Sequence, residues 1–127
     1  MEEAEQLSLR NEEILLHKVA KKVFEEATGT ALGQTCNTVI SFHLKQKFCR
    51  EPYEVLVEDP KTFYKALEEI FGAGAESLMN LLGTFLTRKY TVNCTPKEFV
   101  DIVIKGDEPS KRKLKEILEA VANQIET

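Results

Sequence analysis

The chain has 127 residues, of which 43% are hydrophobic and 30% charged, and its formal net charge is −4. This length is typical of one domain, and the mildly acidic balance argues against nucleic-acid binding. No apolar run is long enough to cross a membrane, and the acidic N-terminus lacks the features of a signal peptide. We therefore expect residues 1–127 to form a single cytoplasmic domain. The three cysteines lack disulfide-like spacing, which favours reduced thiols.

Two helices are predicted in the first part of the chain. Residues 1–7 are expected to be a frayed, acidic lead-in, followed by a helix capped at Ser8 or Asn11. Apolar residues then recur at three- and four-residue spacing as far as Gly29, which is expected to end this helix. A second helix is expected at 32–49, with basic residues near its C-terminal end, where the helix dipole favours them.

The segment 52–58 (PYEVLVE) alternates Tyr53, Val55 and Val57 with other residues, which is typical of extended chain. A lone strand cannot satisfy its own backbone groups, so a packed, strand-like loop is expected here.

A helical hairpin is the clearest pattern in the sequence and spans residues 59–90. Asp59 is a good N-cap, and Pro60 suits the first helical position. Gly72 stands where the first helix requires a left-handed residue after its end. A second apolar stripe then continues as far as Tyr90.

The C-terminal part predicts two more helices. Thr95 and Glu98 form a capping box with a proline between them, and the helix that follows is closed by Gly106. This helix has almost no polar face, so it must be covered on all sides, and any strip left exposed would be a partner site. On that basis we expect a monomer or a weak homodimer. The last helix should begin between Asp107 and Ser110.

These elements predict an all-α fold, a compact antiparallel bundle of five or six helices arranged as helical hairpins. Short segments resemble one another, such as FEEATG at 24–29 and LEEIFG at 67–72. The likeness has two explanations, an internal duplication or the caps and turns that all helical hairpins share. The sequence leaves both open.

Two histidines, His17 and His43, are candidates for a metal, haem or small-molecule site. If the first two helices form a hairpin that turns at residues 29–30, the histidines lie at nearly the same level and face each other. The alternative is that both are ordinary surface or partly buried residues, since two ligands make an incomplete metal site.

The chain has one basic cluster, formed by Lys111, Arg112, Lys113 and Lys115. Four cations near the start of a helix oppose its dipole and repel one another. They indicate either a contact surface for an acidic partner or a solvated helix face.

No catalytic constellation is visible, because the sequence offers neither a nucleophile with a base nor a pair of carboxylates. The small residues at 72–75 lack the spacing of a phosphate-binding loop. We therefore expect a non-enzymatic protein with no cofactor. A protein partner or self-association is expected, and nucleic acid is not.

A set of helix-end and apolar residues recurs as a pattern between Leu16 and Tyr90, about three-fifths of the chain: Ala31-Leu32-Gly33, Asp59-Pro60, Phe63, Leu67 and Phe71-Gly72. In these residues the sequence resembles a small archaeal helical family. These are the Nitrososphaera-type output domains of archaeal signalling proteins, together with uncharacterised stand-alone relatives. The resemblance implies a signal-output or regulatory interaction module and supplies no catalytic residues.

Overall fold

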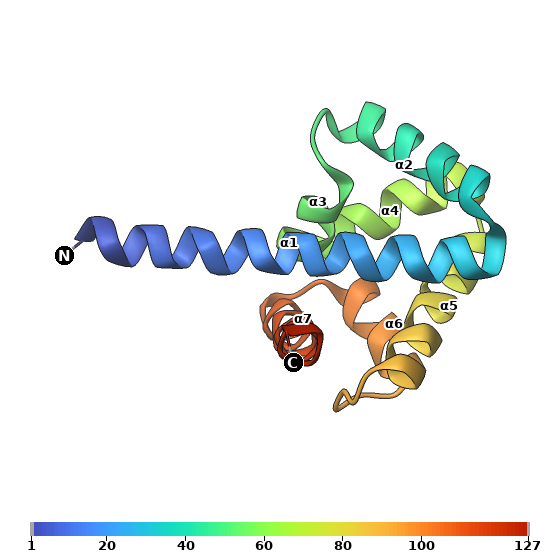
Figure 1. Ribbon diagram of the computed structural model, residues 1–127. Helices are drawn as coiled ribbons and strands as arrows, with labels where there is room; N and C mark the ends of the chain where they lie inside the picture. Colours follow the sequence, from blue (N-terminus) through green and yellow to red (C-terminus); the bar gives the residue numbers. More distant parts are fainter. Residues whose placement is uncertain (1, 127) are drawn as a thin grey trace.

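A computed structural model describes the backbone of residues 2–126 and the side chains of residues 14–125. All regular structure in this range is α-helical, which confirms the predicted fold class (Figure 1). The described residues form seven helices, against the five or six expected: α1 (Glu2–Leu32), α2 (Gln34–Phe48), α3 (Pro52–Glu58), α4 (Pro60–Phe71), α5 (Gly74–Lys89), α6 (Pro96–Lys105) and α7 (Glu108–Glu126).

The first helix is longer than predicted at both ends. It begins at Glu2, upstream of the caps expected at Ser8 or Asn11, so residues 2–7 are helical. It also passes through Gly29 and ends at Leu32. A glycine inside a helix costs only about 1 kcal/mol. The break falls instead at Gly33, whose φ of 91° is unfavourable for any other residue.

The additional helix is α3, where an extended segment was expected. Pro52 occupies its first turn, and a run of side chains is buried between α1 and α4. The alternation of β-branched residues is therefore misleading here, because tertiary packing overrides a weak local propensity. The buried side chains of α3 are Pro52, Tyr53, Val55, Leu56 and Val57.

The N-caps predicted at Asp59 and Thr95 are present, unlike those predicted at Ser8 or Asn11. The Asp59 carboxylate accepts a hydrogen bond from the Thr62 backbone N–H at 3.4 Å and one from its hydroxyl at 2.7 Å. The Thr95 hydroxyl accepts one from the Glu98 N–H at 3.1 Å. Gly72 has the expected positive φ of 58°, but its ψ of −127° lies outside the left-handed helical region.

The long helix α1 lies between two groups of helices. Figure 1 shows α2, α3 and α4 on one side of it and α5, α6 and α7 on the other. Its N-terminal part extends beyond both groups. The expected hairpin arrangement is therefore met only in part, because α1 also packs against α3, α5 and α7. No helix between residues 2 and 126 is long and apolar enough to cross a membrane.

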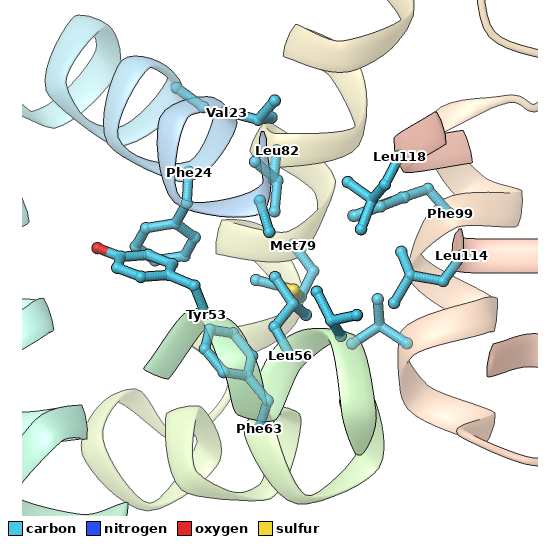
Figure 2. Packing of buried hydrophobic residues seen from close by; sticks show 14 of the residues in the cluster. Val23, Phe24, Tyr53, Leu56, Phe63, Met79, Leu82, Phe99, Leu114 and Leu118 are labelled. Carbon is cyan, nitrogen blue, oxygen red and sulfur yellow. The ribbon is translucent and has the colours of Figure 1, made fainter. Parts of the chain in front are cut away.

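The core joins both groups to α1. On one side, Phe24 meets the edges of Tyr53 and Phe63 at ring-centroid distances of 5.7 and 5.9 Å (Figure 2). On the other side, Met79 and Phe99 are nearly inaccessible and belong to the same cluster. The helices therefore share one continuous core. The side chains outside this core form the surface that can contact a ligand or a partner.

Candidate interaction surface

His17 lies on α1 beside the carboxyl end of α3. Its side chain is 17% exposed, and its Nε2 atom is 3.8 Å from a carboxylate oxygen of Glu58. That distance is too long for a hydrogen bond, and the buried Nε2 atom has no other partner. A hollow beside it, also lined by Tyr53 and Glu54, does not include His43.

The two histidines do not form the facing pair that the sequence suggested. The helix turn lies at Gly33 and not at residues 29–30. Even in an ideal antiparallel pair, this change separates the levels of His17 and His43 by about 9 Å along the helix axis. His43 is exposed on α2, with its ring 5.9 Å from that of Phe42. No group of three or more metal-ligating side chains occurs among the described residues.

The basic cluster is divided between two sides of α7. Arg112 and Lys115 are exposed. Lys111 lies 3.5 Å from Glu108, and the cap of the helix is Asp107, which accepts a hydrogen bond from the Ser110 N–H at 3.0 Å. Bonds from Ser110 hold the pKa of the Asp107 carboxyl below its usual value.

The fourth cation, Lys113, lies on a different side of α7, close to Cys94 in the connector between α5 and α6. Burial raises the pKa of the Cys94 thiol, Glu98 raises it further, and the charge of Lys113 lowers it. A raised pKa leaves less of the thiol in the reactive thiolate form. Lys113 and Arg112 point about 100° apart around the helix axis.

The apolar helix α6 is covered by its own chain. It packs against α4, α5 and α7, and Phe99, Val100 and Val103 are buried. Ile102 and Ile104 are partly buried against the same core. The expectation that this helix needs cover on all sides is wrong, because its charged residues leave one face exposed to solvent: Lys97, Glu98, Asp101 and Lys105. The rest of the described chain covers its apolar side.

The helix α2, in contrast, is apolar on two opposite sides and covered on one. Its inner side buries Ile40 and Leu44. On its outer side, Phe42 is 58% exposed and is the most exposed large hydrophobic side chain among residues 14–125, while Val39 is 49% exposed. These two, with exposed Thr35 and Gln46, form what we call the α2 outer stripe: Thr35, Val39, Phe42 and Gln46.

The spacing of the α2 outer stripe is four, three and four residues, which places its members along one face of a helix. All four are uncharged. The helix has no acidic residue, and its lysines are engaged within the chain: Lys45 lies 3.4 Å from Glu51, and Lys47 pairs with Glu69 of α4. The outer stripe is thus free of charge along its whole length.

More apolar surface lies nearby, where α2 begins and α4 ends. Leu32 is 48% exposed and Phe71 is 39% exposed. Both line a hollow of about 220 Å³ together with Ile40 of α2. That volume is smaller than the ~300–1,000 Å³ of usual small-molecule sites. The hollow therefore extends the apolar surface without forming a ligand pocket.

The sequence analysis did not identify the outer stripe of α2. The sequence does contain a signal for this stripe. Thirteen residues of α2 are uncharged, and its apolar positions lie on two faces of the helix, whereas packing against a core requires only one.

Comparisons with protein families, with characterised proteins and with solved structures found no match to this chain.

Proposed function

We propose that this protein is a non-enzymatic, cytoplasmic regulatory module that binds a protein partner through the α2 outer stripe. One observation carries the proposal: α2 is apolar on opposite sides, and its own chain covers only the inner side. Apolar side chains that a chain leaves exposed side by side on a helix are a feature of partner-binding surfaces. We therefore assign the partner contact to the outer side of α2.

The composition of the stripe supports a protein contact. Aromatic residues are enriched and charges depleted at the centres of protein interfaces. Phe42 and Val39 would form such a centre, with the polar Thr35 and Gln46 at its ends. The rigid aromatic side chain of Phe42 is the residue expected to contribute most to binding.

The other contact surface expected from the sequence, the basic cluster of α7, is less suited to a single partner. Lys113 faces the connector that holds Cys94, and Lys111 already has an acidic neighbour. A metal or haem site at His17 and His43 has no observation in its favour, since the two side chains line no common hollow among those described.

The proposal is tested with the double variant Val39→Glu/Phe42→Glu and a matched control, Ile125→Glu. Ile125 is also an exposed hydrophobic residue, 36% accessible, but it lies on α7. Both proteins should melt close to wild type, because no core side chain is changed. Each is cross-linked to its neighbours in the native cell, and the captured proteins are quantified by mass spectrometry.

We expect the α2 variant to lose the partners that wild type and the Ile125→Glu control retain. If the α2 variant retains them all, the α2 outer stripe is not the contact surface and the proposal is wrong.

A further inference from the structure

We infer that the groove between α1 and α5 binds a free fatty acid, with its carboxylate at Arg88 and its aliphatic tail along α5 towards Phe71. This inference goes beyond the proposed function, because it concerns a different surface and adds a small-molecule ligand to the protein contact. It is carried by the size of the groove, by its largely apolar lining and by one unpaired cation at its end.

The groove is formed where the C-terminal end of α1 lies beside the second half of α5. A hollow of about 420 Å³ lies between the two helices. This volume is within the ~300–1,000 Å³ of usual small-molecule sites. On its α1 side the hollow is lined by Ala27, Thr30 and Ala31, whose small side chains leave the space open. This hollow is therefore large enough to hold a ligand.

The α5 side of the hollow is apolar except at one end. Leu81 and Phe85 are partly buried against the core and line the hollow. Arg88 and Lys89, in the last turn of α5, line its end. No acidic residue among those described lines the hollow. The lining therefore changes from apolar to cationic along the helix, which suits a ligand with an apolar tail and an anionic head.

Of the two cations, only Arg88 is unpaired among the described residues. Lys89 pairs with Glu26 of α1, and its Nζ atom lies 5.5 Å from the centre of the Phe85 ring. Arg88 is exposed, and no carboxylate oxygen of residues 14–125 lies within 4.0 Å of its nitrogens. One unpaired positive charge matches a ligand with a single negative charge. A guanidinium group also binds a carboxylate through two parallel hydrogen bonds.

The tail has an apolar path along α5. Leu81 lines both this hollow and the hollow of about 220 Å³ at the end of α4, so the two adjoin. The smaller hollow cannot hold a ligand by itself, but it lengthens the larger one. The α5 residues that line the two hollows run from Gly74 to Arg88 at steps of three and four, a length of about 21 Å along the helix axis. An extended aliphatic chain can follow such a path.

A fatty acid in this position would also cover apolar side chains that the chain leaves exposed. Leu32 and Phe71 are exposed, and both line the smaller hollow. A peptide suits the path less well, because its backbone N–H and C=O groups would need hydrogen-bond partners. The uncharged polar side chains that the described lining offers are only Thr30, Ser77 and Thr84.

The first experiment titrates the full chain by isothermal titration calorimetry with decanoate, decanol and octanoate, below the concentrations at which they aggregate. Decanoate should bind as a single molecule per chain. Decanol should bind at least about tenfold more weakly, since it lacks the charged contact with Arg88. Octanoate should bind more weakly by about two- to fourfold for each methylene group removed. Failure of decanoate to bind, or equal binding of the three compounds, overturns the inference.

The second experiment tests the position of the carboxylate with Arg88→Gln. This variant should weaken the binding of decanoate by at least about tenfold and leave that of decanol unchanged, because only the charge is removed. Arg112→Gln, which changes an exposed arginine of α7, is the matched control and should bind as wild type does. If Arg88→Gln binds decanoate as tightly as wild type, the inference is wrong.

The third experiment tests the path of the tail with Ala31→Phe, which fills the groove from an exposed position. Decanoate should raise the melting temperature of wild type but not that of this variant. Thr38→Phe, an aromatic substitution at an exposed position of α2, is the matched control and should be stabilised as wild type is. Equal stabilisation of Ala31→Phe and wild type would place the ligand elsewhere and overturn the inference.

A lipid bilayer is another source of anionic heads and aliphatic tails. Vesicles of phosphatidylcholine and phosphatidylserine should leave the chain in the supernatant after sedimentation, because a groove of this size encloses one tail. Wild type that sediments with vesicles but does not bind decanoate would assign the groove to a membrane surface and overturn the inference. None of these results bears on the α2 outer stripe, which is tested through Val39 and Phe42.

Discussion

The helices α2 and α6 are both rich in apolar residues, yet the fold treats them differently. In α6, Phe99 and Val103 are almost inaccessible, and α4, α5 and α7 pack against the apolar side of the helix. In α2, the inner face is equally well buried, but Phe42 on the outer face is 58% exposed. The sequence pointed to α6 as the helix that governs association, because its six-residue run FVDIVI looked the most apolar.

The difference shows that apolar composition predicts that side chains need to be buried, but does not predict which neighbouring helices will bury them. The apolar side of α6 is covered because three helices, α4, α5 and α7, pack against it. The helix α2 lies at the edge of the molecule, with α1 on one side and only the short α3 and part of α4 to pack against (Figure 1). An exposed apolar face is therefore left on α2.

The largest expected effect compares one phenylalanine from each helix. Phe99→Ala should lower the free energy of unfolding by about 3–5 kcal/mol, because it removes a ring that is 2% exposed and leaves a cavity. Phe42→Ala should change it by less than about 0.5 kcal/mol at protein concentrations where the chain is monomeric. Urea unfolding of both variants measures the difference. Similar losses would mean that Phe42 is covered within its own chain.

The ends of the two helices give the next comparison. Gly106 follows α6 with a φ of 57°, and a Cβ atom there would lie 2.5 Å from the Cβ of Lys61. Gly106→Ala should therefore destabilise the protein by at least about 1 kcal/mol. At the end of α2 the left-handed residue is Cys49, with a φ of 55°.

A glycine suits the position of Cys49 better, so Cys49→Gly should stabilise the protein by about 0.5 kcal/mol, the net of relieved strain and lost chain stiffness. Thermal melts of both variants check the opposite signs. A stabilised Gly106→Ala protein would show that the turn after α6 is free to move away from Lys61.

The two helices also differ at their N-terminal ends, because α6 has a side-chain cap and α2 has none. Thr95 caps α6 through the Glu98 N–H, whereas α2 follows Gly33 with no side-chain cap. Thr95→Ala should cost about 1 kcal/mol, and Thr95→Asp should cost little. Thr35→Ala, at an exposed position in the first turn of α2, is the control and should stay within about 0.5 kcal/mol of wild type. Equal urea midpoints for Thr95→Ala and wild type would contradict the cap.

Much of the fold could be predicted because its signals are local. The Asp59 and Thr95 caps depend on residues three positions apart, and Gly72 and Gly106 were identified from the ends of apolar stripes. These rules concern one helix end at a time, and the surrounding fold does not change them.

The features that the sequence did not predict depend on contacts between distant segments. Segment 52–58 is helical because α1 and α4 enclose it, and its own alternation gave the opposite indication. The place of the first turn, at Gly33 instead of Gly29, decides the level of His17 relative to His43. The outer stripe of α2 was unrecognised because exposure depends on which helices stand beside it. A single sequence does not specify those neighbours.

The last comparison sets the uncharged outer side of α2 against the charged start of α7. The triple variant Lys111→Glu/Arg112→Glu/Lys113→Glu should fold normally and gain up to about 1 kcal/mol, because acidic residues suit the first turns of a helix. It should keep the partners of wild type if α2 is the contact surface. Loss of those partners in a salt-sensitive pull-down would instead assign the contact to the basic cluster.

One member of that cluster has an effect of its own. The charge of Lys113 lowers the pKa of the Cys94 thiol, in opposition to burial and Glu98. Lys113→Glu removes this lowering and adds a negative charge, so the pKa of Cys94 should rise and less thiolate should be present at any pH near the pKa.

The rate at which iodoacetamide alkylates Cys94 measures this change, since the thiolate is the reactive form. Peptide mass spectrometry between pH 7 and 10 should show slower alkylation of Cys94 in Lys113→Glu than in wild type. Arg112→Glu, on the exposed side of the same helix turn, should leave the rate nearly unchanged. Equal slowing by both variants would show that Cys94 responds to the overall charge of α7 and not to Lys113 itself.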